Sequence, residues 1–211
     1  MIWLDLLSPR KWAQIDPRLL PFADLTSDDL PLWKLFRLSL FQVSVGMATA
    51  LMVGTLNRVL IVELGVAAWL VATMVALPVL VAPFRALIGF RSDTHRSAIG
   101  WRRVPFIWTG SILQFGGLAI MPFALILLSG DTHWPTWIGP ASAALSFLLV
   151  GLGMQTVQTA GLALATDLVA TDKRPRMVAL MYTMLLVGML VSALVFSLVL
   201  EDFSKFRLIQ V

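Results

Sequence analysis

The sequence predicts an all-α protein, a polytopic bundle of membrane-spanning helices. Of its 211 residues, 58% are hydrophobic and only 13% are charged, whereas a typical soluble domain has about 25% charged residues. The mean hydropathy is +0.85. Five apolar stretches each reach the roughly 20 residues that a helix needs to cross a bilayer. Lysine and arginine gather in alternate links between these stretches, a pattern that fixes the orientation of membrane proteins.

Residues 1–33 form a leader before the first apolar stretch. The leader carries five aspartates and four prolines, so it lacks the cationic start and uninterrupted apolar core of a secretory signal. Its tryptophans Trp3, Trp12 and Trp33 favour a position in the headgroup region of a membrane. A loosely ordered cytoplasmic tail is the alternative.

The membrane domain is predicted to run from residue 34 to residue 211. Its spans cover residues 35–57, 66–90, 104–128, 138–166 and 177–200, and the first can extend to residue 64. Residues 203–211 begin a sixth, returning span, so we expect this chain to be a fragment. The segment from the N-terminus to the first turn of the first span, which includes Lys34 and Arg37, and the links after the second and fourth spans hold 13 of the 16 lysines and arginines. The N-terminus is therefore expected in the cytoplasm.

An internal repeat relates the first and fourth spans. At an offset of 107 residues, "VSVGMATALMVGT" aligns with "VGLGMQTVQTAGL", and the identical pairs are Val43 and Val150, Gly46 and Gly153, Met47 and Met154, Thr49 and Thr156, and Gly54 and Gly161. These two spans run in opposite directions, so the repeat is an inverted one of the kind that builds halves of secondary transporters. Close packing of helices at the glycines is the alternative explanation.

Polar residues inside membrane spans are rare and mark candidate binding sites. The residues predicted to face a pigment or another ligand are Asn57, Glu63, Gln114, Gln155, Gln158 and Thr159. Hydrogen bonding between helices is the alternative for the glutamines and Thr159. Glu63 can instead pair with Arg58, or both can reach the headgroups. The chain has no cysteine and no catalytic motif, and both histidines lie in predicted loops; we therefore expect neither an enzyme nor a resident metal site.

The link "APFRALIGFRSDTHRSAIGWRRVP" after the second span holds five arginines. Its residues Gly89, Arg91, Asp93, Arg96, Gly100, Arg102 and Arg103 resemble the Gly-x-x-x-Asp plus basic signature of the major facilitator superfamily, although the usual signature is more tightly spaced. The resemblance implies a gating or docking role for this cytoplasmic link. The alternative is that Arg91, Arg96, Arg102 and Arg103 only fix topology and attract anionic lipid. At the start of the link, the helix can bend at Pro83 and the Arg85 side chain can reach toward the headgroups.

Longer segments resemble a narrower branch of that superfamily, the bacteriochlorophyll delivery branch with its PucC/LhaA-type light-harvesting assembly proteins. These segments are "LNRVLIVELGV", "ALPVLVAPFRALIGFRSDTHRSAIGWRRVPFIW", "LQFGGLAIMPFALI" and "ATDLV". The resemblance implies the N-terminal half of a major-facilitator-type fold with a 3+3 inverted repeat. It also implies a bacterial inner or intracytoplasmic photosynthetic membrane and an assembly role, with the core antenna preferred over the peripheral antenna.

The same resemblance implies cargo and partners. Bacteriochlorophyll would be bound, or would be held transiently during delivery. Because no predicted span contains a histidine, its magnesium would take an oxygen ligand. Whether carotenoid binds is unknown from the sequence. The implied partners are antenna polypeptides, the reaction-centre complex, a bacteriochlorophyll-synthesis enzyme, the translocation machinery and the lipid bilayer, but no nucleic acid. The alternatives are a secondary transporter of a small solute and a structural subunit of a photosynthetic complex.

Overall fold

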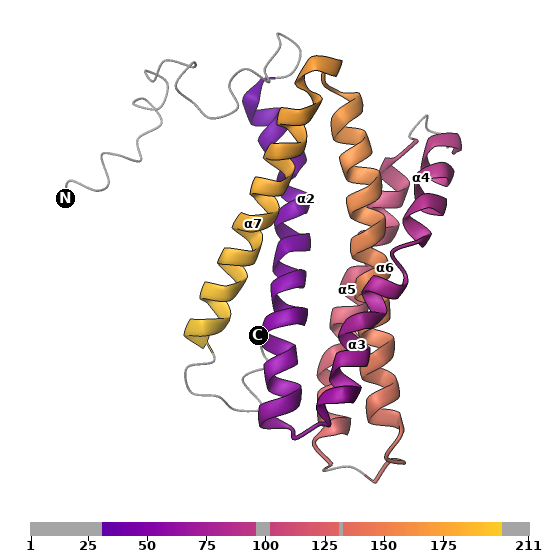
Figure 1. The fold of residues 1–211 in the computed structure, drawn as a ribbon, viewed down its shortest axis with the longest axis vertical. Coiled ribbons are helices and arrows are strands. Elements are labelled where there is room, and N and C mark those ends of the chain that lie inside the picture. Colours follow the sequence, from indigo (N-terminus) through magenta and orange to yellow (C-terminus); the bar gives the residue numbers. More distant parts are fainter. Residues whose placement is uncertain (1–30, 96–101, 131–132, 200–211) are drawn as a thin grey trace, which may run out of the picture.

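A computed structural model describes residues 31–95, 102–130 and 133–199, and these residues contain helices and links but no strand (Figure 1). Five helical tracts are long and apolar enough to cross a membrane, namely Leu32–Glu63, Ala68–Thr94, Val104–Leu128, Ile138–Asp167 and Thr171–Val199. The predicted all-helical bundle with five such helices is therefore confirmed. The predicted start of a sixth span, nearly all of the leader, Arg96 and Gly100 lie outside the described residues.

The first tract changes its helical geometry halfway along. It begins after Pro31 as α2 (Leu32–Ala50) and continues as two π-helical segments, η3 (Leu51–Leu56) and η4 (Val59–Glu63). At its end the Leu64 N–H donates to the Val59 carbonyl at 3.0 Å, across the five-residue interval of a π-helix. The longer of the two predicted extents is thus the observed one.

The second tract is broken, where the sequence predicted one continuous span. It consists of α3 (Ala68–Leu80) and α4 (Phe84–Thr94), joined by a turn at residues 81–83. In this turn the Ala82 N–H donates to Val79 at 3.0 Å, three residues back, and Pro83 has no N–H to donate. The regular four-residue ladder is therefore interrupted in the middle of the span.

The remaining helices are α5 (Val104–Leu128), α6 (Ile138–Asp167), the short η5 (Thr171–Lys173) and α7 (Arg174–Val199). Helix α6 packs against both α5 and α3, whereas α2 and α7 lie side by side (Figure 1). Glycine makes both contacts close, because a Cβ at Gly153 would overlap the backbone of Gln114, and a Cβ at Gly46 would overlap the Leu185 carbonyl. Missing side chains let membrane helices approach to this distance.

Two apolar clusters tie these helix pairs together at opposite ends. Leu60, Met74 and Phe147 belong to a cluster that joins η4, α3 and α6, whereas Leu35 and Met177 belong to one that joins the start of α2 to α7. Two grooves follow the first tract from Ser44 to Glu63, beside the cluster that contains Leu60. Of the predicted polar residues, Glu63 and Gln114 line these grooves, whereas Gln155, Gln158 and Thr159 lie on α6.

Candidate functional site

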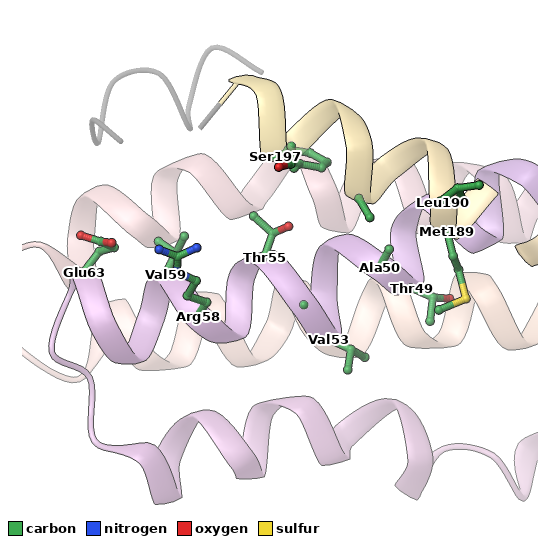
Figure 2. Close-up of a pocket in the computed structure, with 13 residues that line it drawn as sticks. Thr49, Ala50, Val53, Thr55, Arg58, Val59, Glu63, Met189, Leu190 and Ser197 are labelled. Atoms are coloured by element: carbon green, nitrogen blue, oxygen red, sulfur yellow. The ribbon is translucent and has the colours of Figure 1, made fainter. Parts of the chain in front are cut away.

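The larger groove lies between the π-helical part of the first tract and α7, and we call it the α2–α7 groove (Figure 2). Its volume is about 840 Å³. Its floor and walls are mostly apolar, hydroxyl groups are set along it, and one end carries two charged side chains. The lining residues are Thr49, Ala50, Val53, Gly54, Thr55, Arg58, Val59, Glu63, Met189, Leu190, Ala193, Phe196 and Ser197.

The two charged residues of this groove, Arg58 and Glu63, are both exposed. The predicted alternative of pairing between them does not occur, since no ion pair joins them in the described part of the chain. Asn57, beside Arg58, is half-buried and does not line the groove. Of the six predicted ligand-facing residues, the structure thus brings only Glu63 to the α2–α7 groove.

A second groove of about 380 Å³ lies between α2, α5 and α7. Gln114 lines it, but its side chain is buried and its Nε2 donates to the Ser44 carbonyl at 3.1 Å. On the other side, the Ser192 hydroxyl donates to the Met47 carbonyl at 3.1 Å. For Gln114 the interhelical hydrogen bond, which was the alternative prediction, is therefore the observed role.

The polar stripe of α6 faces the break in the second tract. Gln155 Nε2 donates to the Pro78 carbonyl at 3.3 Å. This carbonyl needs a donor because the amide of Ala82, which would bond it in a regular helix, bonds Val79 instead. The Oε1 atom of Gln155 is buried without a hydrogen-bond partner among the described residues. Gln155 thus stabilises the broken span.

Arg85, just after the break, also contacts this stripe. Its Nε donates to the Thr159 hydroxyl at 3.3 Å, and that hydroxyl in turn donates to the Gln155 carbonyl at 2.7 Å. A Cβ at Gly89 would lie 3.7 Å from the Thr159 methyl, an ordinary van der Waals contact, so α4 and α6 lie close together here without requiring glycine. The Nε of Arg85 is thus satisfied by α6, and the reach of the rest of the side chain toward the headgroups stays a prediction.

Gln158 is the exception on α6. Its side chain is half-exposed and makes no hydrogen bond within the described residues. At 100° per residue it lies between Thr159, which contacts α4, and Gly161, which contacts Phe41 of α2. It therefore presents an amide toward the space between α2 and α4.

A charge cluster surrounds Arg103, which lies just before α5 and whose side chain is only 11% exposed. Its Nη2 lies 2.9 Å from an Asp93 carboxylate oxygen and 3.0 Å from an Asp167 carboxylate oxygen. Arg102 Nη2 donates to the Asp93 backbone carbonyl at 3.0 Å, whereas Arg91 is exposed. This cluster joins the ends of α4 and α6 to the start of α5.

Two contributors were not predicted from the sequence. Asp167 is the last residue of the fourth tract and pairs with Arg103. The only indication of this pair in the sequence was an acidic residue at the end of a span in a protein whose links are rich in arginine. Gln42 of α2 is wholly buried, and neither of its amide atoms has a hydrogen-bond partner among the described residues. Gln42 lies one turn before Gly46, inside an apolar stretch. A lone amide side chain within a predicted span is also what identified Gln114.

In a comparison with known protein families, the family model described as "PUCC protein" matches residues 55–211 of this chain. Among the relatives, "Protein PucC" of Rhodovulum sulfidophilum is 63% identical over 99% of this chain and 46% of its own length. An "Uncharacterized protein in puhA-bchM intergenic region" of Rhodobacter capsulatus is 58% identical over 98% of this chain and 43% of its own length.

A more distant relative, "Bacteriochlorophyll synthase 44.5 kDa chain" of Rhodobacter capsulatus, is 31% identical over 84% of this chain and 40% of its own length. The chain therefore spans less than half the length of the curated relatives that it matches. No solved structure matches it significantly.

Proposed function

Since the chain belongs to the PUCC protein family, we propose that it takes part in the biogenesis of bacterial light-harvesting complexes as a non-enzymatic assembly factor. The observation that carries this proposal is the 63% identity to a PucC protein over 99% of the chain. The name of the more distant relative, a bacteriochlorophyll synthase chain, favours pigment as the cargo. Antenna polypeptides, with the core antenna preferred, are the proposed recipients; a reaction-centre complex, a pigment-synthesis enzyme and the translocation machinery are further proposed partners.

We further propose that Gln158 provides the oxygen that ligates the magnesium of bacteriochlorophyll. Magnesium prefers oxygen donors, and Gln158 is a half-exposed amide without a partner in the described chain. Gln114 and Gln155, by contrast, already bond to backbone carbonyls. An uncharged single ligand suits a carrier that releases its cargo.

The proposed architecture is the N-terminal half of a major-facilitator-type fold in the bacterial inner membrane, with a cytoplasmic N-terminus. Two contacts support the inverted repeat: Gly151 approaches Pro78 of α3, and Gly46 approaches Leu185 of α7. Leu185 lies 107 residues after Pro78, which equals the offset of the repeat. Gly151 lies 105 residues after Gly46, within two residues of the same offset. The repeat would thus relate the packing of α3 on α6 to that of α7 on α2.

The test is the near-infrared spectrum of the protein purified in mild detergent. We expect pigment in a fixed ratio to the wild-type protein, a lower ratio for Gln158→Leu, and recovery with Gln158→Glu, which restores an oxygen donor. Gln114→Leu is the matched control, because that glutamine bonds to Ser44 and its loss should leave the pigment ratio unchanged.

Three outcomes would count against the proposal. An unchanged pigment ratio in Gln158→Leu would remove this residue from the site. Pigment carried entirely by co-purifying antenna polypeptides would favour a structural subunit. A pigment-free protein without antenna polypeptides that takes up solute in vesicles would favour a secondary transporter.

A further inference from the structure

The π-helical geometry of the first tract coincides with the α2–α7 groove. The π segments η3 and η4 cover Leu51–Leu56 and Val59–Glu63, and the groove is lined from Thr49 to Glu63. π turns inside α-helices are rare and frequently occur at functional sites. In this chain they shape one wall of the larger groove.

This geometry determines how the two charges face the groove. In an α-helix, residues five apart point about 140° away from each other, so Arg58 and Glu63 would lie on different faces. In a π-helix the hydrogen bond joins residues five apart, which places such residues on one side. Both side chains accordingly line the same end of the groove, and they do not pair with each other.

The charged end and the apolar trough have the dimensions of one membrane leaflet. Glu63 lies 14 residues after Thr49, which corresponds to at most about 20 Å at the α-helical rise, and the π turns η3 and η4 shorten this length. Half of a hydrocarbon core measures about 15 Å. Val53, Leu190 and Ala193 line the trough between these ends, so an acyl chain lying there would place its headgroup at Arg58 and Glu63.

We propose that the α2–α7 groove seats one phospholipid with a zwitterionic, amine-bearing headgroup. Arg58 binds the phosphate, Glu63 faces the ammonium group, and one acyl chain lies along the trough. The headgroup type follows from the charges: Arg58 and Glu63 together have no net charge, and a headgroup without an ammonium group would leave the Glu63 carboxylate facing the phosphate with no cation of the lipid to offset it. This lipid is distinct from the pigment, and its binding does not depend on the function proposed above.

The experiment measures lipid binding to the full-length, delipidated protein by native mass spectrometry. The probes are phosphatidylethanolamine and phosphatidylglycerol with identical acyl chains. We expect one tightly bound phosphatidylethanolamine and a preference of about 2- to 5-fold over phosphatidylglycerol, the range given by one exposed charge pair. Glu63→Gln should abolish the preference, and Arg58→Gln should weaken the binding of both lipids. Arg37→Gln, an exposed charge on α2 outside the groove, should change neither.

A second pair of variants tests the trough without altering charge. A Cβ at Gly54, which lines the groove, or at Gly116, which does not, would have no heavy atom within 4 Å. Both positions therefore accept a larger side chain. We expect Gly54→Leu to fill the trough and weaken binding of both lipids, whereas Gly116→Leu should bind them as the wild type does.

The proposal is overturned if phosphatidylglycerol binds as well as phosphatidylethanolamine, if the preference survives in Glu63→Gln, or if Gly54→Leu binds lipid normally. It is also overturned if the full-length protein binds no lipid tightly because another helix or a pigment fills the groove.

Discussion

Replacing Arg103 with glutamine should destabilise the end of the bundle where α4, α5 and α6 meet more than removing either of its acidic partners. Arg103 holds Asp93 and Asp167 on one nitrogen. Losing one aspartate leaves the other pair intact. Losing the arginine leaves two carboxylates facing each other with no cation between them. The interaction that remains is therefore attractive in an aspartate variant and repulsive in the arginine variant.

The magnitude follows from the geometry. The two carboxylate oxygens lie 2.9 and 3.0 Å from the same Nη2 atom, so they are within about 6 Å of each other. At that separation two like charges repel by about 0.7 kcal/mol in water and about 3 kcal/mol at the dielectric of a protein surface. Both aspartates are about half exposed, so we expect a loss in the lower part of this range, about 1–2 kcal/mol.

The assay compares unfolding of the purified variants in one detergent. The expected order of stability is wild type, then Asp93→Asn and Asp167→Asn, then Arg103→Gln. Asp167→Asn added to Arg103→Gln should restore part of the loss, because it removes the repulsion. Arg91→Gln, an exposed arginine of α4, serves as the control with no expected effect. The reasoning is refuted if the double variant is less stable than Arg103→Gln, or if either aspartate variant is the least stable of the set.

Two further predictions concern the packing of α5. Gly153→Ala should force α5 and α6 apart and destabilise the protein by about 1–3 kcal/mol, which is measured as a lower yield of monodisperse protein. Gly116→Ala is the control and should be neutral, because a Cβ there meets open space. Equal yields of the two variants would contradict this packing. Gln114→Leu should lower the free energy of unfolding by about 0.6 kcal/mol, the average for a hydrogen bond between membrane helices, and a loss above about 2 kcal/mol would indicate that Gln114 does more than bond Ser44.

Hydropathy predicted the helical tracts well because the bilayer imposes both their length and their composition. The third predicted span, residues 104–128, has the same bounds as α5. The sequence indicated that the helix can bend at Pro83, but it did not predict the break at residues 81–83, because a proline inside a membrane helix can be accommodated without a break. What decides between these outcomes is whether a neighbouring helix can satisfy the carbonyls that the break leaves without donors.

The same dependence on neighbours explains which polar residues were interpreted correctly. Hydropathy and spacing identified Gln114, Gln155 and Gln158 equally well, yet two of them bond to backbone carbonyls of other helices and one does not. Gln155 has its partner only because the second tract breaks and frees the Pro78 carbonyl. A polar residue in a span therefore becomes a structural bond or a candidate ligand according to the backbone of the helix opposite, and that backbone is fixed by packing rather than by the residue's own segment.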